Sequence, residues 1–158
     1  MPYLLRRFQA LTRERPEQLT NASGSREELV HRFLGALERG DVPALEAMRV
    51  SPAEFSHLFF PESIFMRPPY ELDPRVVWMQ IDAGSNTGLR RAVQHYRGMS
   101  FGYLGLICQP PQRQGTMQVH GCDVRRISAR GDTVRDRMFG AILERAGQFK
   151  FLSLENKL

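Results

Sequence analysis

The sequence predicts an α+β domain in which N-terminal helices cover an antiparallel sheet. Between Ser100 and Glu155, apolar runs alternate with short turn-like segments, a pattern typical of a four-stranded meander. Upstream of the meander, several segments begin with a helix-capping residue and continue with apolar residues at helical spacing. The chain has 158 residues, of which 42% are hydrophobic and 25% charged, and this composition suits one globular domain.

The helices are expected in the first half of the chain. Ser25–Arg39 has a serine cap with glutamate three residues later and apolar residues at helical spacing, and Gly40 supplies its end. Asp41 caps a short second helix. Ser51 opens a third helix, which has proline at its first position and a second capping box.

The middle of the chain is expected to be less regular. Ile64–Pro74 is rich in proline and is interpreted as a loop crossing the mouth of the core. Val76–Ile81 is interpreted as a short strand closed by Asp82–Gly84. A fourth helix is expected from Asn86 to Gly98.

Residues 1–24 are expected to be an N-terminal arm or linker, and residues 25–158 a single domain. The sequence Thr20–Gly24 has a linker composition. Leu4, Leu5 and Phe8 can form a short amphipathic helix that packs on its own domain or on a neighbour.

The predicted meander turns at Gln109–Gln114, Ser128–Asp132 and Glu144–Gly147. Folding neighbouring strands about these turns places one set of residues on a common face, and a slip of one residue would break that agreement. The cross-strand pairs expected on this face are Tyr103 with Gly121, Ile107 with Met117, Val119 with Ala141, Asp123 with Arg137, Leu143 with Phe149 and Arg137 with Glu155.

The face expected beneath the helices is apolar at one end and charged at the other. Asp123, Arg137 and Glu155 form a row beside Tyr103. The row has three interpretations: a structural ion pair, a ligand-binding site, or a catalytic base at Asp123. An arginine neighbour lowers the pKa of a carboxyl, which favours the first two. The predicted ligand-binding residues are Tyr103, Asp123, Arg137, Glu155 and Trp78.

The reverse face of the meander is also apolar and is expected to mediate a homodimer, because soluble monomers rarely expose such a patch. The competing cover is the arm Met1–Leu11. The residues expected to face outward are Leu104, Leu106, Met138, Ile142, Leu152 and Leu154.

Cys108 and Cys122 are the only cysteines. In the predicted register they lie about 20 Å apart, at about 3.4 Å per residue, which is too far for a disulfide. They are therefore expected to be free thiols. No motif for a metal, a phosphate loop or a cofactor is present, so neither a metal site nor a cofactor is predicted.

The charge pattern does not favour specific nucleic-acid binding. The net charge is +5, but the basic residues are scattered, and all except Lys150 and Lys157 are arginine. No apolar run has the roughly 18–20 residues of a membrane span. The N-terminal sequence lacks a secretory signal, so no membrane association and a cytoplasmic location are expected.

The segment Phe33–Leu45, in which a long helix ends at Gly40-Asp41 and a short helix follows, resembles the opening of the nuclear transport factor 2-like superfamily. The late meander ending in Phe149–Leu154 looks like that superfamily too, so the resemblance covers Ser25 to the C-terminus. Ser51–Pro74 departs from it, because a capped helix and a proline-rich loop replace the usual early strand.

The resemblance implies a strongly curved sheet with helices packed into its concave side, forming a cone with a pocket. It also implies one of several functions, since the superfamily includes isomerases, dehydratases and cyclases as well as binding and dimerisation modules. The function expected here is a small-molecule-binding or self-associating module for an apolar or anionic ligand. The alternative is a small lyase or isomerase that uses Asp123.

Overall fold

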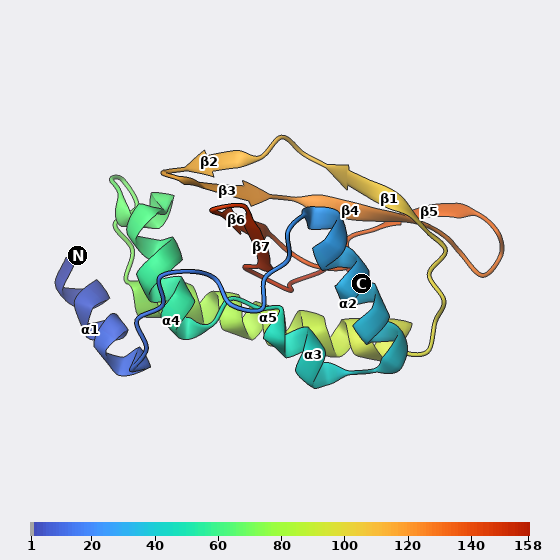
Figure 1. The fold of residues 1–158 in the computed structure, drawn as a ribbon, viewed down its shortest axis with the longest axis horizontal. Coiled ribbons are helices and arrows are strands. Elements are labelled where there is room, and N and C mark those ends of the chain that lie inside the picture. Colours follow the sequence, from blue (N-terminus) through green and yellow to red (C-terminus); the bar gives the residue numbers. More distant parts are fainter. Residues whose placement is uncertain (1) are drawn as a thin grey trace.

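A computed structural model describes residues 2–158 and has the predicted α+β class (Figure 1). The long helix α5 runs beneath the strands, α2 lies in front of them, and α1 forms one end of the molecule. The helical elements are α1 (Pro2–Thr12), α2 (Arg26–Arg39), α3 (Val42–Ala47), α4 (Pro52–Glu54), the π-helical turn η1 (Phe55–Phe59), the 3-10 turns η2 (Phe60–Glu62) and η3 (Ile64–Met66), and α5 (Pro74–Tyr96).

Local sequence signals place the first three helix starts as predicted. The side chain of Ser25 accepts a hydrogen bond from the backbone N–H of Glu28, and Gly40 ends α2 in the left-handed conformation. Asp41 caps α3 in the same way. Ser51 forms a complete capping box with Glu54 at the start of α4.

The predicted strand Val76–Ile81 is wrong, because α5 is one helix of 23 residues. Asp73 caps it and Pro74 occupies its first turn, which is a favourable start. The β-branched residues of Val76–Ile81 favour a strand locally, but tertiary packing overrides that preference. The predicted fourth helix is the second half of α5.

Small residues within α5 serve close packing rather than a turn. A Cβ on Gly88 would lie 2.0 Å from the carbonyl oxygen of Leu154, so only glycine lets the C-terminal segment pass here. The hydroxyl of Ser85 accepts a hydrogen bond from the backbone N–H of Leu154 at 3.0 Å. The side-chain amide of Asn156 donates to the carbonyl of Gly88 at 2.7 Å.

The strands make four antiparallel passes, as predicted, but these passes form two sheets. The orders are β1-β4-β5 and β2-β3-β6-β7, and both sheets are open rather than one strongly curved sheet (Figure 1). The strands are β1 (Tyr103–Cys108), β2 (Gln112–Gln114), β3 (Met117–His120), β4 (Cys122–Ile127), β5 (Thr133–Asp136), β6 (Ile142–Arg145) and β7 (Gln148–Phe151).

Two of the predicted registers need correction. The first hairpin turns at Gly115-Thr116 rather than at Gln109–Gln114, so Ile107 lies opposite Asp123 instead of Met117. The proline pair in that segment interrupts the pass without reversing it, because proline has no N–H for the ladder. The last hairpin slips by one residue, so Leu143 lies opposite Lys150 rather than Phe149.

The hairpin between β4 and β5 has the predicted register. Val124 pairs with Asp136 and Ile127 with Thr133. The ladder ends there, and the next residue, Arg137, donates a hydrogen bond from Nε to the carboxylate of Asp123 at 3.1 Å. The pairing shifts by two beyond this hairpin, however, so Val119 lies opposite Leu143 instead of Ala141.

Cys108 and Cys122 form a disulfide, so the prediction of two free thiols is wrong. The two residues are direct cross-strand partners, and their Cα atoms lie 4.0 Å apart. The error comes from the first register, which displaced β1 by about six residues along its partner. The bond joins β1 to β4 at the point where the two sheets meet.

The residues expected at a dimer interface are mostly buried within one chain. Met138, Ile142, Leu152 and Leu154 are at most 8% exposed, whereas Leu104 is 45% exposed. One apolar core lies beneath α2, and a second forms where α1 and η1 pack on the four-stranded sheet. These residues therefore do not form an exposed apolar patch that a second copy would have to cover. The homodimer itself stays a prediction.

The N-terminal arm packs on its own chain through α1. Leu5 and Phe8 are buried in the second core together with Leu152. Met1, the first residue of the predicted arm, lies outside the described residues. None of the described helices combines the length and apolar character needed to cross a membrane.

Candidate functional site: a cleft where the two sheets separate

A cleft opens at the junction between the two sheets because their strands change partners there. β3 and β4 are continuous except for Gly121, yet β3 pairs with β6 and β4 pairs with β5. His120 pairs with Ile142 and Val124 with Asp136. Four positions separate His120 from Val124 (124 − 120), but six separate Asp136 from Ile142 (142 − 136). The two extra residues make segment 137–141 leave the ladder.

The other side of the junction is also irregular. Residues 109–111 connect β1 to β2, and two of them are prolines that cannot donate to the ladder. The backbone N–H of Gln109 still bonds to the carbonyl of Gly121 at 2.9 Å. Segments 109–111 and 137–141 therefore both leave the strand ladder beside Gly121, and a cavity forms between them.

This cavity, which we call the junction cleft, has a volume of about 550 Å³. The C-terminal segment, η3 and α5 complete its walls. Its apolar wall consists of Phe65, Ile81, Val119, Phe139, Ala141 and Leu152. Its polar rim includes Gln109, Gln112, Arg137, Ser153, Glu155 and Lys157.

Asp123 contacts Arg137, as predicted, but on the face opposite to the one predicted. Cys122 and Val124 point to the core beneath α2, and we call this side of the three-stranded sheet the inner face. Because side chains alternate along a strand, Asp123 lies on the other side, the outer face. Its carboxylate accepts hydrogen bonds from Nε of Arg135 at 2.7 Å and Nε of Arg137 at 3.1 Å.

The two arginines set the ionisation of Asp123. Partial burial acts to raise the pKa of its carboxyl, but the hydrogen bonds and charges of Arg135 and Arg137 outweigh burial and lower the pKa below its ordinary value. Asp123 is therefore held as a carboxylate and is a poor proton acceptor near neutral pH.

The rim of the junction cleft carries cationic groups without partners. Arg137 uses Nε for Asp123, and within residues 2–158 its terminal nitrogens make no hydrogen bond. Lys157 lies beside it, since its backbone N–H donates to the carbonyl of Arg137 at 3.2 Å. Its ammonium has no ion-pair partner in the described part of the chain.

Asn156 adds a neutral polar group to the cleft lining. It is 7% exposed, and its side-chain nitrogen is bonded to the carbonyls of Gly88 and Met138. Its Oδ1 is buried and accepts no hydrogen bond from any described residue. A buried acceptor without a donor is costly to the fold.

The remaining predicted site residues are dispersed. Glu155 lines the junction cleft with Arg137, although the two are not paired as predicted. Tyr103 is on the inner face, where its ring meets that of His31 with centroids 4.7 Å apart. Burial and the nearby charge of Glu27 raise the pKa of Tyr103.

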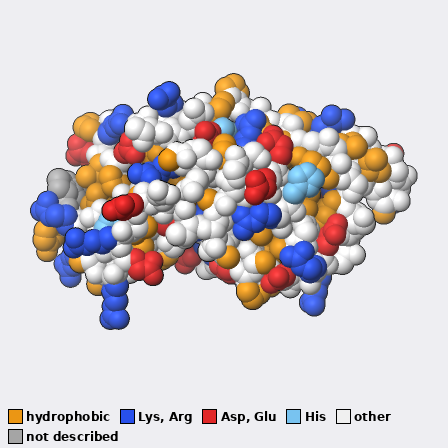
Figure 2. Space-filling view, in the orientation of Figure 1, with side chains coloured by type: hydrophobic (Ala, Val, Ile, Leu, Met, Phe, Trp, Pro, Cys, Tyr) orange, Lys and Arg blue, Asp and Glu red, His pale blue; other side chains and the backbone are white. Residues whose placement is uncertain are grey.

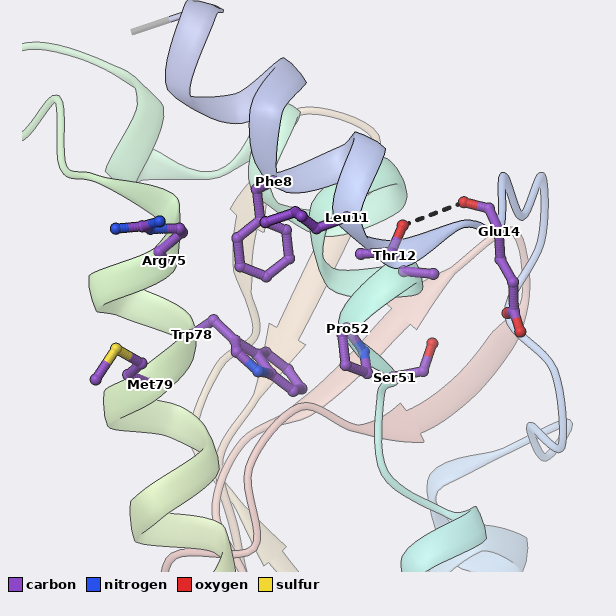
Figure 3. Close-up of a pocket in the computed structure, with 10 residues that line it drawn as sticks. Phe8, Leu11, Thr12, Glu14, Ser51, Pro52, Arg75, Trp78 and Met79 are labelled. Carbon is purple, nitrogen blue, oxygen red and sulfur yellow. Dashed lines mark hydrogen bonds between the residues drawn. The ribbon is translucent and has the colours of Figure 1, made fainter.

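Trp78 lies away from the junction cleft, in a groove of about 630 Å³ between α1 and α5. Figure 3 shows Trp78 from α5 and Phe8 from α1 reaching into the same space, with Pro52 at its end. Trp78 also packs on Phe55 with ring centroids 5.1 Å apart. The predicted common cavity for Trp78 and the charged row is therefore not formed.

A polar network on the inner face was missed by the sequence analysis. Asp136 accepts hydrogen bonds from Nε of Arg126 at 2.7 Å and from the hydroxyl of Tyr96 at 2.9 Å. The guanidinium of Arg126 also lies over the Tyr96 ring, 5.4 Å from its centroid. Burial and the hydrogen bond to Asp136 raise the pKa of Tyr96, so its hydroxyl stays protonated.

A second missed cluster surrounds His120, which is buried beside the disulfide. Nε2 of His120 lies 2.7 Å from Oε1 of Glu144, and Nδ1 lies 3.1 Å from Nη1 of Arg26. Because arginine only donates, Nδ1 must be the acceptor, and Nε2–H then donates to Glu144. Both ring nitrogens are occupied, so His120 is not free to act as a base.

The sequence contained a signal for one missed part of the site. With Asp123 opposite Arg137, the two-residue period of a strand also places Arg125 and Arg135 on the outer face. No such signal existed for Asn156 or Lys157, since their positions depend on how the C-terminal segment crosses α5.

The described residues contain no group of three or more His, Cys, Asp or Glu side chains arranged to hold a metal ion. Comparisons with protein-family models, curated proteins and solved structures find no match for this chain. Figure 2 shows basic side chains spread over the visible face rather than gathered in one large patch.

Proposed function

We propose that the protein is a binding module for an amphipathic anion, whose apolar part occupies the junction cleft. The observation that carries this proposal is the cleft's composition, an apolar wall whose rim has two cationic side chains, Arg137 and Lys157, and one carboxylate, Glu155. Ligand sites are commonly apolar cavities of roughly 300–1,000 Å³ with a few polar groups that orient the ligand. Arg137 and Lys157 supply such groups for an anion.

The enzyme alternative is less well supported by the residues present. A lyase or isomerase needs a base inside the cavity, and Asp123 was its candidate. Asp123 is bound to two arginines that lower its pKa, and both ring nitrogens of His120 are occupied. Glu155 lines the cleft, but it is exposed to solvent rather than enclosed in the apolar wall.

The nuclear transport factor 2-like resemblance remains part of the proposal. It is supported by the break at Gly40-Asp41 between α2 and α3 and by the four antiparallel passes that follow α5. Where an early strand is usual, Val50 donates one backbone hydrogen bond to Phe151 at 2.8 Å. The open sheets count against the cone that the resemblance implies.

The disulfide favours folding in an oxidising compartment, because such bonds rarely persist in the cytosol. The cytoplasmic location was expected because the N-terminal sequence lacks a secretory signal, and the disulfide counts against it. Thiol titration of the denatured, unreduced protein should detect no free thiol. Detection of both Cys108 and Cys122 as free thiols would restore the cytoplasmic prediction.

The proposal is tested by calorimetric titration with octanoate and with octanol, which have the same chain but differ in charge. Octanoate should bind more tightly, because only it can pair with Arg137 and Lys157. The variant Ala141→Trp fills the cleft from its apolar wall and should weaken octanoate binding by at least about tenfold, or roughly 1.4 kcal/mol. The matched control is Ala129→Trp, which places the same side chain in the exposed turn after β4.

Octanoate binding that is unchanged in Ala141→Trp would place the ligand elsewhere on the protein. Absence of binding by both probes would remove the proposed function. Both tryptophan variants should keep the thermal stability of the wild type, so that a change in octanoate binding reports on the cleft and not on unfolding.

A further inference from the structure

The outer face of the three-stranded sheet contains a cross-strand pair of like charges. Arg125 on β4 lies directly opposite Arg135 on β5. Like charges directly opposite each other destabilise a sheet. Both side chains are exposed, so the fold itself does not require them there.

This pair continues directly into the rim of the junction cleft. Arg135 shares the carboxylate of Asp123 with Arg137, and Arg137 lines the cleft. The cluster therefore contains three arginines and one carboxylate. In the described part of the chain, Arg125 has no side-chain hydrogen bond, and the terminal nitrogens of Arg135 and Arg137 have none either.

The shape of the outer face leaves these groups accessible. Arg135 and Arg137 have side-chain exposures of 55% and 40%. Gly105 lies opposite Arg125 on β1, and a Cβ there would meet nothing within 4 Å. Asp123 binds both arginines through Nε, so their terminal nitrogens are free to donate to a ligand.

We propose that Arg125, Arg135 and Arg137 bind the phosphate headgroup of the amphipathic ligand whose apolar part lies in the junction cleft. This inference rests on the proposed function and specifies its ligand as a phosphate monoester. A carboxylate has two coplanar oxygens, which one guanidinium can satisfy. A phosphate monoester carries a charge of about −1.5 to −2 and three acceptor oxygens, so it can use several guanidinium groups at once.

The test compares octyl phosphate with octanoate, each below its aggregation concentration, by calorimetric titration of the full chain. Octyl phosphate should bind at least about tenfold more tightly, since its extra charge and third acceptor oxygen allow additional charge-assisted hydrogen bonds. Arg125→Gln should weaken octyl phosphate about tenfold and change octanoate binding less than about twofold. The matched control is Arg90→Gln, which removes an exposed arginine from α5 and should alter neither affinity.

The two proposals fail in different ways. If octanoate binds and Ala141→Trp blocks it, but octyl phosphate is no tighter, the phosphate assignment is wrong and the binding cleft stands. If neither amphiphile binds, both proposals are wrong. If a short DNA duplex displaces octyl phosphate at physiological salt, the arginines serve a nucleic-acid backbone, and the small-ligand assignment is overturned.

Discussion

Asp136 and Asp123 lie on the paired strands β5 and β4 and show how the two faces of one sheet use the same chemistry differently. Each aspartate accepts a 2.7 Å hydrogen bond from an arginine Nε and a second hydrogen bond from another side chain. Asp136 points inward to Tyr96 and Arg126, whereas Asp123 points outward to Arg135 and Arg137. Both carboxylates are largely shielded, with side-chain exposures of 23% and 13%.

The difference lies in the arginines rather than in the aspartates. The side chain of Arg126 is 12% exposed and packs on Tyr96, so its surface is used by the fold. Arg135 is 55% exposed, and its terminal nitrogens have no partner in residues 2–158. The inward ion pair thus contributes to packing, while the outward one leaves the terminal nitrogens of its arginines without a hydrogen bond in residues 2–158.

The largest loss of stability is expected when one partner of the most buried ion pair is removed. Glu54 and Lys150 are each 2% exposed, and Nζ lies 2.7 Å from Oε1. Lys150→Met should reduce the free energy of unfolding by about 3–5 kcal/mol in urea denaturation, because it leaves a buried carboxylate without its cation. The double variant Glu54→Gln/Lys150→Met should recover much of that loss. If Lys150→Met reduces the free energy of unfolding by less than about 1 kcal/mol, burial of an ion pair does not determine its contribution to stability in this protein.

Glu54 also gives this pair a defined pH dependence. Burial raises the pKa of Glu54, but hydrogen bonds from Lys150, Ser51 and Thr20 outweigh burial and lower it. Its contribution to stability is therefore present above about pH 4 and lost as the pH falls through the lowered pKa.

An intermediate effect is expected on the inner face. Asp136→Asn should reduce the free energy of unfolding by about 1.5–3 kcal/mol, because it removes the charge that pairs with the mostly buried Arg126. Thermal and urea denaturation measure this loss. A loss no larger than that of Asp123→Asn would remove the distinction between the two faces.

The smallest effect on stability is expected on the outer face. Asp123→Asn should cost less than about 1 kcal/mol near neutral pH, because its arginine partners are exposed. The folded-state pKa of Asp123 is lowered, so its contribution is present above about pH 4 and is lost at lower pH. The difference between wild type and variant should therefore shrink between about pH 5 and pH 2 in an acid denaturation series. A constant difference across that range would show that Asp123 contributes without its charge.

The candidate site was predictable only where strand pairing was local. The register about the Ser128–Asp132 turn brings Arg137 beside Asp123, and the same alternation brings in Arg125 and Arg135. The cleft beside them was not predictable, because it arises from two extra residues between Asp136 and Ile142. Whether such residues bulge or shift a whole strand depends on packing against α5 and the C-terminal segment.

The sequence by itself determined the helix starts at Ser25, Asp41 and Ser51, since a cap is a contact between residues three positions apart. It also determined the antiparallel order of the four passes, because each follows the last through a short turn. Tertiary structure alone decided the disulfide, the helical state of Val76–Ile81 and the face on which Asp123 lies. Each of these depends on contacts between distant segments, and a shift of a few residues in one register changes which side chains meet.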